Sequence, residues 1–262
     1  MRLKGRRALV TGASAGLGAA VAMELAREGA AVVINSRDPQ RLDNAAAKIK
    51  AATGIVPVTI AANVATGEGL EKIARTVCPG GKCDIDILFS NAGGPPPGQF
   101  LALDENAFPD AAQLVLDAAI KLTRIVLGGM VERKWGRLIY LTSVGVLQPL
   151  DNLLLSNTYR SAVAAFCKTI SNNYAQYGIT ANCVCPGYTA TERLENLARQ
   201  GAKDAGLTPE AVIAGYAANI PARRVGRPEE LGALVAFLAS DRAAYITGTS
   251  IPVDGGFNKA LI

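Results

Sequence analysis

A glycine-rich turn near the start of the chain carries the clearest chemistry in the sequence. It runs from Thr11 to Gly18, between a short strand-like run and a stretch with helical spacing. Glycines let backbone N–H groups approach a pyrophosphate, and the positive end of the following helix attracts its charge. The turn therefore predicts a dinucleotide site that includes Gly12, Ser14, Ala15, Gly16, Leu17 and Gly18.

The residue types that are missing or rare also limit the chemistry. The 262 residues include no histidine and five cysteines. Without histidine, neither a Ser-His-Asp triad nor a Cys/His zinc site can be assembled, and we expect no bound metal. We expect the cysteines to be buried free thiols in a reducing compartment. Cys183 and Cys185 lie two apart in a strand-like run, so they should face the same side of a sheet.

Charge and hydropathy narrow the range of partners. The formal net charge of +5 comes from scattered basic residues, and only 5% of the residues are aromatic, which does not favour nucleic-acid binding. No apolar run approaches the ~20 residues that span a bilayer. The basic segment Met1–Arg7 leads into a strand-like run and not into a signal-peptide core. We expect a cytoplasmic protein that acts on a small molecule, without nucleic-acid or membrane partners.

Short β-branched runs alternate with longer Ala- and Leu-rich stretches along the chain. Stretches such as 18–28 and 41–52 have helical apolar spacing. This alternation predicts an α/β protein, a parallel sheet with helices on both faces, in one domain over residues 1–262. Residues at about 189–225 contain no strand-like run, and we expect a lid-like insertion there. The runs predicted as buried strands are 8–10, 31–34, 56–60, 85–89, 138–141 and 180–184.

The spacing T-G-x-x-x-G-x-G resembles that of the short-chain dehydrogenase/reductase family. Further motifs of that family follow in the expected order as far as the C-terminal run 246–256. The resemblance covers nearly the whole chain. It implies a doubly wound Rossmann-type fold with seven strands, NAD(P)-dependent oxidation or reduction of a carbonyl or alcohol, and a homodimer or homotetramer. It also places around the cofactor Asn63, Val64, Asn91, Ala92, Gly93, Pro186, Gly187, Thr189 and Thr191.

The end of the second predicted strand favours NADP over NAD. A carboxylate at that place would bind the ribose 2′-hydroxyl of NAD and repel a 2′-phosphate. Ser36 stands there instead, and the guanidinium of Arg37, which follows it, can bind a phosphate bidentately. Asp38 comes next and its direction is open, so NAD is kept as the alternative.

The resemblance also locates the catalytic positions, and three of them differ from the family. Ser143 matches the serine that orients the carbonyl. Thirteen residues later Ser156 replaces the family's proton-transferring tyrosine, and four residues further Arg160 replaces its lysine. Spacing back from Met130 puts Val115 at the family's asparagine.

The substituted pair requires a different route for the proton. Ser156 and Arg160 share one helix face, but arginine does not shuttle protons and serine is a much weaker acid than tyrosine. Tyr159 lies about sixty degrees around the helix from Ser156 and is a candidate proton donor. Its competing role is packing against the core. Tyr188, beside the motif that resembles the nicotinamide-binding segment, is a second candidate.

Three functions therefore stay open, and the first is favoured. An oxidoreductase would use Ser143, Ser156, Tyr159 and Arg160 with an altered proton route. A catalytically silent dinucleotide-binding protein would keep the cofactor motifs and lack the usual catalytic groups. A lyase resembling halohydrin dehalogenases would use an arginine such as Arg160, but those enzymes replace the glycine-rich turn with a halide pocket.

Overall fold

The chain folds around one parallel sheet in the computed structural model, which describes residues 1–261 apart from the side chain of Asp204. Its seven strands follow the order β3-β2-β1-β4-β5-β6-β7, and every neighbouring pair is parallel. The order runs outward from β1 in one direction and from β4 in the other, so the prediction of a doubly wound Rossmann-type sheet is confirmed. The strands are β1 (Arg7–Val10), β2 (Ala31–Ser36), β3 (Val58–Ala61), β4 (Ile87–Ser90), β5 (Gly136–Leu141), β6 (Ile179–Pro186) and β7 (Ser250–Val253).

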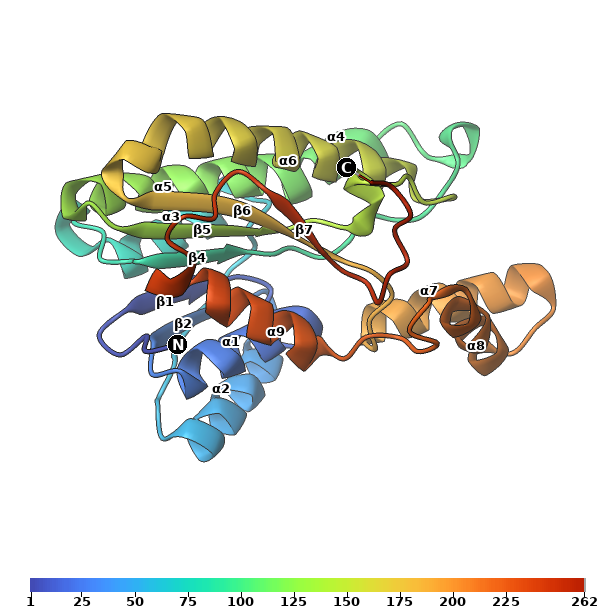
Figure 1. Cartoon of the computed structure of the whole chain (residues 1–262), viewed down its shortest axis with the longest axis horizontal. Coiled ribbons are helices and arrows are strands. Elements are labelled where there is room, and N and C mark those ends of the chain that lie inside the picture. The colour runs from blue at the N-terminus through green and yellow to red at the C-terminus, as the bar shows by residue number, and fades with distance from the viewer. Residues whose placement is uncertain (262) are drawn as a thin grey trace.

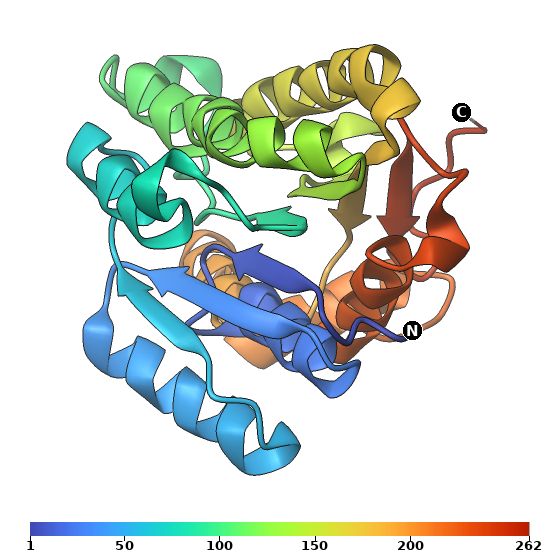
Figure 2. The same cartoon turned by 90° about the vertical axis from the view of Figure 1, so that its left-hand side faces the viewer.

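Helices cover both faces of the sheet, as Figures 1 and 2 show. Helices α1 (Gly16–Arg27), α2 (Pro39–Thr53) and α9 (Pro228–Leu238) lie on one face. The other face carries α3 (Gly67–Val77), α5 (Ala118–Arg133) and α6 (Leu154–Tyr174). The strands' apolar side chains divide between two buried clusters, one under each helical layer. Burial on both faces explains why the strands are continuous hydrophobic runs and do not alternate.

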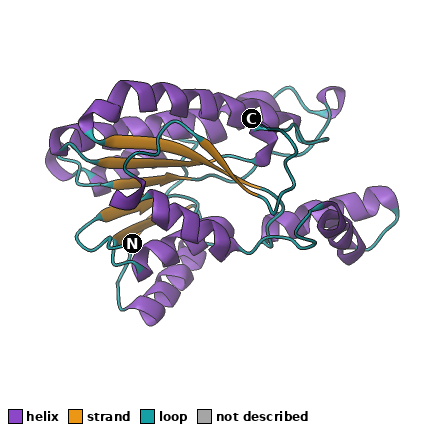
Figure 3. Cartoon of the chain, in the orientation of Figure 1, coloured by secondary structure: helices purple, strands orange, loops and turns teal. Residues whose placement is uncertain are grey.

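Two helices stand apart from these layers. Helix α7 (Glu192–Ala205) packs against α8 (Pro209–Asn219), and both lie beyond the carboxyl ends of the strands (Figures 1 and 3). They occupy most of the segment 189–225. None of the described side chains of α8 is buried, so this helix contributes little to the core.

An irregular helix precedes α5. Helix α4 (Ala107–Ala111) passes into a π-helical turn (Ala112–Asp117), which continues directly as α5. Such turns widen the hydrogen-bonding ring by one residue and often occur beside functional sites. Single-turn 3₁₀ helices complete the structure at Pro79–Gly81, Phe100–Ala102, Val144–Val146, Ala175–Tyr177 and Asp241–Ala243.

Most element boundaries differ by one or two residues from the sequence-based prediction, and two of these differences have local reasons. Strand β3 begins at Val58 and not at Val56, because Pro57 has no N–H to donate and Val56 remains 68% exposed. Helix α1 begins at Gly16, two residues earlier than its apolar spacing indicated, because the last part of the glycine-rich turn already forms helix.

The cysteines lie where the sequence predicted. Cys183 and Cys185 belong to the same buried cluster, and all five cysteines are free thiols, with Cys78 only partly buried. Among the side chains described for residues 1–261, which leave out that of Asp204, no group of three or more metal-ligating residues gathers. Among the helices of that range, none combines the length and apolarity needed to cross a bilayer.

Candidate functional site

A cavity of about 640 Å³ lies at the carboxyl ends of the strands, where α/β sheets of this kind bind ligands. The segments that follow β1 to β6 all contribute to its wall. Gly18 and Tyr159 are the two predicted site residues outside that wall. The predicted residues within it are Gly12, Ser14, Ala15, Gly16, Leu17, Ser36, Arg37, Asn63, Val64, Asn91, Ala92, Gly93, Ser143, Ser156, Arg160, Pro186, Gly187, Thr189 and Thr191.

Gly18 lies behind the glycine-rich turn and allows it to close. A Cβ atom on Gly18 would lie 2.1 Å from the carbonyl oxygen of Gly12. At Gly12 itself, φ is +59° and a Cβ atom would lie 2.6 Å from Nδ2 of Asn91. At Gly18 no other residue fits without moving the backbone, and at Gly12 the positive φ and the contact with the Asn91 side chain disfavour any side chain. The close approach brings the first turn of α1 to the cavity wall.

The start of α1 is suited to an anion. Its N-cap residue, Ala15, offers no side-chain hydrogen bond, and its first turn contains no acidic residue. By contrast, Asp38 caps α2 and Thr66 caps α3 through their side chains. The first N–H groups of a helix need partners, and those of α1 lie at the cavity wall. A pyrophosphate would supply acceptors there, so the residues of this turn fit a dinucleotide.

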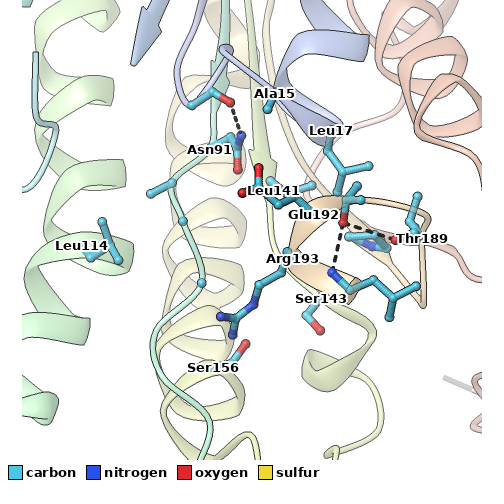
Figure 4. Close-up of a pocket in the computed structure, with 18 of the residues that line it drawn as sticks. Ala15, Leu17, Asn91, Leu114, Leu141, Ser143, Ser156, Thr189, Glu192 and Arg193 are labelled. Carbon is cyan, nitrogen blue, oxygen red and sulfur yellow. Dashed lines mark hydrogen bonds between the residues drawn. The ribbon is translucent and has the colours of Figure 1, made fainter. Parts of the chain in front are cut away.

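Asn91 connects the turn after β1 to the end of β4. Its backbone N–H donates to Oγ1 of Thr11 at 2.9 Å, and the same hydroxyl donates to the carbonyl oxygen of Asn91 at 2.7 Å. Its side-chain amide donates to the carbonyl oxygen of Gly12 at 3.2 Å (Figure 4). These bonds fix the segment Asn91-Ala92-Gly93 against the glycine-rich turn.

The end of β2 presents cations and hydroxyls to the cavity. Ser36 and Arg37 line it, and Oγ of Ser36 donates to Oγ of Ser14 at 2.9 Å. The carboxylate of Asp38 is used elsewhere, since it accepts a hydrogen bond from the backbone of Arg41 as the cap of α2. The carboxylate whose direction the sequence left open is therefore a helix cap, and Asp38 is not part of the cavity wall. We call the glycine-rich turn together with Ser36 and Arg37 the cofactor end.

Ser143 lies two residues after β5, and its hydroxyl caps the 3₁₀ helix that follows it. Its Oγ accepts a hydrogen bond from the backbone N–H of Gly145 at 3.0 Å. Because this bond occupies a lone pair, the hydroxyl proton remains free to donate into the cavity. We call Ser143, Ser156 and Arg160 the reaction end.

Ser156 and Arg160 form a hydrogen-bonded pair on one face of α6. Nε of Arg160 donates to Oγ of Ser156 at 3.2 Å, and Nη1 donates to the carbonyl oxygen of Leu141 at 2.8 Å. Arg160 is only 8% exposed. Burial lowers its pKa to about 10, with a further contribution from the charge of Arg193, so the guanidinium is still protonated at neutral pH. The hydroxyl of Ser156, like that of Ser143, is free to donate its proton.

The two tyrosines considered as proton donors have different surroundings. Tyr159 is partly buried against the core cluster under α5 and α6, outside the cavity wall. Tyr188 does line the cavity, with its ring stacked on Tyr216 at a centroid distance of 4.2 Å. Burial raises the pKa of Tyr188 above its ordinary value, which makes it a poorer acid. Neither arrangement resembles an activated phenol.

Val115 lies within the π-helical turn and is buried in the same core cluster. A small internal void separates it from Asn91 and Arg160, which line the void from the other sides. An apolar side chain offers no hydrogen bond at this place, so the reaction end relies on Ser143, Ser156 and Arg160.

Two arginines in the wall were missed by the sequence analysis. Arg41 lies beside Arg37 and forms an ion pair with Glu192, with 2.5 Å between Nη2 and Oε2. Arg193 reaches into the cavity from the start of α7, and its side chain points toward Ser156 (Figure 4). The one sequence feature that could have indicated Arg41 is its position four residues after Arg37. Nothing in the sequence distinguished Arg193 from the other charged residues of α7.

The fold and the cavity together define a dinucleotide-binding α/β protein with hydroxyl groups beside the nucleotide site. The family model described as enoyl-(acyl carrier protein) reductase matches residues 12–258. Oxidoreductase UcpA of Escherichia coli strain K12 is 33% identical over 97% of this chain and 95% of its own length. The 3-oxoacyl-[acyl-carrier-protein] reductase FabG of Haemophilus influenzae is also 33% identical, over 97% and 98%.

Among solved structures, L-sorbose reductase of Gluconobacter frateurii, complexed with NADPH and L-sorbose, superposes with a TM-score of 0.92. It is 32% identical to this chain, and the alignment covers all of both chains. The chain belongs to the short-chain dehydrogenase/reductase family, as its motifs indicated, and is an NAD(P)-dependent oxidoreductase. These relatives favour that function over the silent binder and the lyase.

Proposed function

We propose that this protein is an NADPH-dependent reductase of a small carbonyl compound, which acts in reverse as an alcohol dehydrogenase. One observation carries the proposal. A single cavity joins an intact, anion-binding glycine-rich turn to two hydroxyls, Ser143 and Ser156, each held by an N–H donor and free to donate its proton. When bound, NADPH supplies the hydride that reduces the carbonyl carbon.

The choice of NADP rests on charge at the end of β2. Arg37 and Arg41 line the cavity beside the end of β2, where the carboxylate of Asp38 caps α2 and that of Glu192 pairs with Arg41. A dianionic phosphate is attracted to this pair of guanidinium groups, while a 2′-hydroxyl gains little from them. L-sorbose reductase, with NADPH in its crystal structure, supports the same choice.

The reaction end stabilises negative charge on the substrate oxygen. As the carbonyl is reduced, its oxygen becomes an alkoxide, to which Ser143 and Ser156 donate hydrogen bonds. The charge of Arg160 acts through Ser156, whose Oγ it already contacts. A solvent water then protonates the alkoxide, and the resulting hydroxide passes into bulk water. No side chain has to change its protonation state.

This route replaces general acid catalysis by electrostatic stabilisation. Loss of a general acid typically costs ~10²–10⁴ in rate. Each preorganised donor to a developing oxyanion is worth roughly 10²–10³. The hydroxyl of Ser156 and the buried guanidinium of Arg160, added to the family's serine, therefore offset part of the loss of the tyrosine. Turnover of a carbonyl substrate would distinguish this reductase from a silent binding protein.

The proposed function also includes a domain organisation, a lid and an oligomeric state. We regard residues 1–262 as one domain, in which the segment at about 189–225, with α7 and α8, acts as a lid over the cavity. A homodimer or homotetramer in the cytoplasm agrees with the family resemblance. Helix α6 carries the segment 162–166 that we expect at the interface, although Val163 is buried within the subunit.

Nucleotide binding is the first test, followed through the fluorescence of NADPH and NADH. Arg37→Ala should weaken NADPH binding by roughly 10- to 100-fold and leave NADH binding unchanged, because only NADPH carries the phosphate. Arg75→Ala is the matched control, since Arg75 is exposed on α3 in an ion pair with Glu71. Failure of the wild type to bind either nucleotide would refute the proposal.

Turnover separates the reductase from the silent binder. The wild type should oxidise NADPH in the presence of members of a panel of aldehydes and ketones. Ser143→Ala should slow that reaction by roughly 10²–10³-fold with NADPH affinity unchanged. NADPH binding without turnover of any carbonyl would favour a binding protein instead.

A further inference from the structure

The guanidinium groups at the reaction end carry positive charge that no nearby carboxylate balances. The cavity wall has four arginines, Arg37, Arg41, Arg160 and Arg193, and a single acidic residue, Glu192. Glu192 pairs with Arg41 at the cofactor end. Among the side chains that the structure describes, which exclude those of Asp204 and Ile262, no carboxylate forms an ion pair with Arg160 or Arg193.

Arg193 is held in place by neutral groups. Its Nη2 donates to the carbonyl oxygen of Pro95 at 2.8 Å, and the guanidinium lies flat enough against Gly94 that a Cβ atom there would be 2.9 Å from Nη2. A guanidinium has five N–H donors, and this bond uses one. The side chain points toward Ser156 at the reaction end (Figure 4). The group is therefore oriented, yet most of its donors are left for a ligand.

The two guanidinium groups are near enough to repel each other. Burial and the charge of Arg193 both lower the pKa of Arg160. Partial burial also lowers the pKa of Arg193. Like charges that share a cavity without a counter-charge destabilise the empty protein, and an anion placed between them removes that penalty.

Other groups of the cavity wall are available to bind the phosphates of the cofactor. The N-terminal turn of α1 receives the pyrophosphate, and Arg37 with Arg41 faces the 2′ position. Arg193, by contrast, contacts Gly94 and Pro95, which follow the segment Asn91-Ala92-Gly93, and it points to the reaction end. The negative charge that complements Arg193 therefore belongs to the substrate.

We propose that the substrate is a carboxylate-bearing carbonyl compound, an oxo acid, whose carboxylate binds Arg193 while its carbonyl oxygen faces Ser143 and Ser156. This proposal rests on the proposed function and names its substrate class. The carbonyl carbon accepts the hydride, the carbonyl π electrons become a lone pair on oxygen, and water protonates that oxygen. The products are a hydroxy acid and NADP⁺. Arg193 is a specificity-determining residue in this scheme.

Calorimetric binding to the NADP⁺-loaded protein tests the proposal without requiring turnover. The probes are 2-oxobutanoate, 3-oxobutanoate and 4-oxopentanoate, each compared with its methyl ester, and dihydroxyacetone phosphate compared with dihydroxyacetone. At least one oxo acid should bind roughly 10- to 100-fold more tightly than its ester, because the ester cannot pair with a guanidinium. Equal binding of every acid and its ester, or no binding of any acid, would overturn the proposal. A stronger preference for the phosphate ester than for any carboxylate would also overturn it.

Substitutions test whether Arg193 causes the preference for an oxo acid over its methyl ester. Arg193→Gln should reduce the acid-to-ester ratio to roughly one, and Arg193→Lys should retain part of it, because lysine keeps the charge and loses the planar fork. Arg199→Gln is the control, since Arg199 lies on the same helix, outside the cavity wall, in an ion pair with Glu195. Arg193 is open to solvent on the cavity side, so these changes leave the core intact.

NADPH fluorescence titration of the same variants separates this proposal from the cofactor site. Arg193→Gln should bind NADPH with the affinity of the wild type. A large loss of NADPH affinity would assign Arg193 to the cofactor and overturn the proposal. If the wild type binds no nucleotide, the proposed function fails, and titration of the cofactor-free protein with the same acids and esters still decides whether Arg193 selects a carboxylate.

Discussion

The cofactor end and the reaction end of the cavity are built from different chemical groups. At the cofactor end, the turn contributes backbone N–H groups, and its glycines are required because Cβ atoms at Gly12 and Gly18 would meet neighbouring atoms. At the reaction end, the side chains of Ser143, Ser156 and Arg160 supply the donors. A site made from backbone depends on chain shape, whereas a site made from side chains can change its chemistry by substitution while the fold persists. The reaction end departs from the family motif, and the cofactor end does not.

The largest loss of NADPH affinity is expected at Gly18, where the backbone of the glycine-rich turn is most closely packed. Gly18→Ala places a Cβ atom 2.1 Å from the carbonyl oxygen of Gly12, so the turn must open. We expect NADPH affinity to fall by at least roughly 100-fold, measured by fluorescence titration, because the N–H groups of α1 no longer converge on the pyrophosphate.

Gly128→Ala provides the matched control for that change. Gly128 lies within α5, and a Cβ atom there meets nothing within 4 Å. Alanine in a helix interior is favoured over glycine by about 0.5–1 kcal/mol, so this variant should bind NADPH normally and unfold at a slightly higher temperature. Equal nucleotide affinity in both variants would show that the close packing of the turn is unimportant.

An intermediate effect is expected at the reaction end. Arg160→Met removes the donor to Ser156 and the buried charge, and should lower kcat by roughly 10²–10³-fold in steady-state assays. Arg160→Lys keeps the charge and should recover part of the rate. Wild-type kcat in Arg160→Met would mean that the hydroxyls act without the guanidinium.

The smallest expected effect is the change of kcat with pH. Burial keeps the pKa of Arg160 near 10, well above neutrality, and raises that of Tyr188. Since Arg160 is charged below that value and loses its proton above it, kcat should be constant from pH 6 to 9 and fall as the pH rises through about 10. Arg160→Met should lack the alkaline fall. A fall in wild-type kcat near pH 7 would reveal a different titrating group.

The sequence predicted the regular and backbone-determined features well. Buried strands are continuous β-branched runs, and the glycine-rich turn has a spacing tied to its geometry, so both were located from residue order alone. The direction of Asp38 was not, because a carboxylate before a helix can cap it or face outward, and only the hydrogen bond from the backbone of Arg41 decides between them.

The reaction end was harder to predict from sequence. Spacing placed Ser156 and Arg160 on one face of α6, and the structure brings their side chains into contact. The orientation of Tyr159 depended on the rotation of α6 against the core, which the sequence does not determine. Arg193 was missed because its role comes from contact with Pro95, a residue distant in sequence, and a lone arginine at a helix start has no distinctive pattern.

The first turn of α7 contacts both ends of the cavity. Thr191 caps this helix, and its methyl group would lie 3.4 Å from a Cβ atom on Gly16, while Arg193 donates to the carbonyl oxygen of Pro95. A rigid displacement of α7 would alter both contacts together. Binding at the two ends is then thermodynamically linked, and by reciprocity each ligand strengthens or weakens the other by the same factor. The first turn of α7 would thus couple the affinities for nucleotide and substrate, in addition to the direct contact that hydride transfer requires between them.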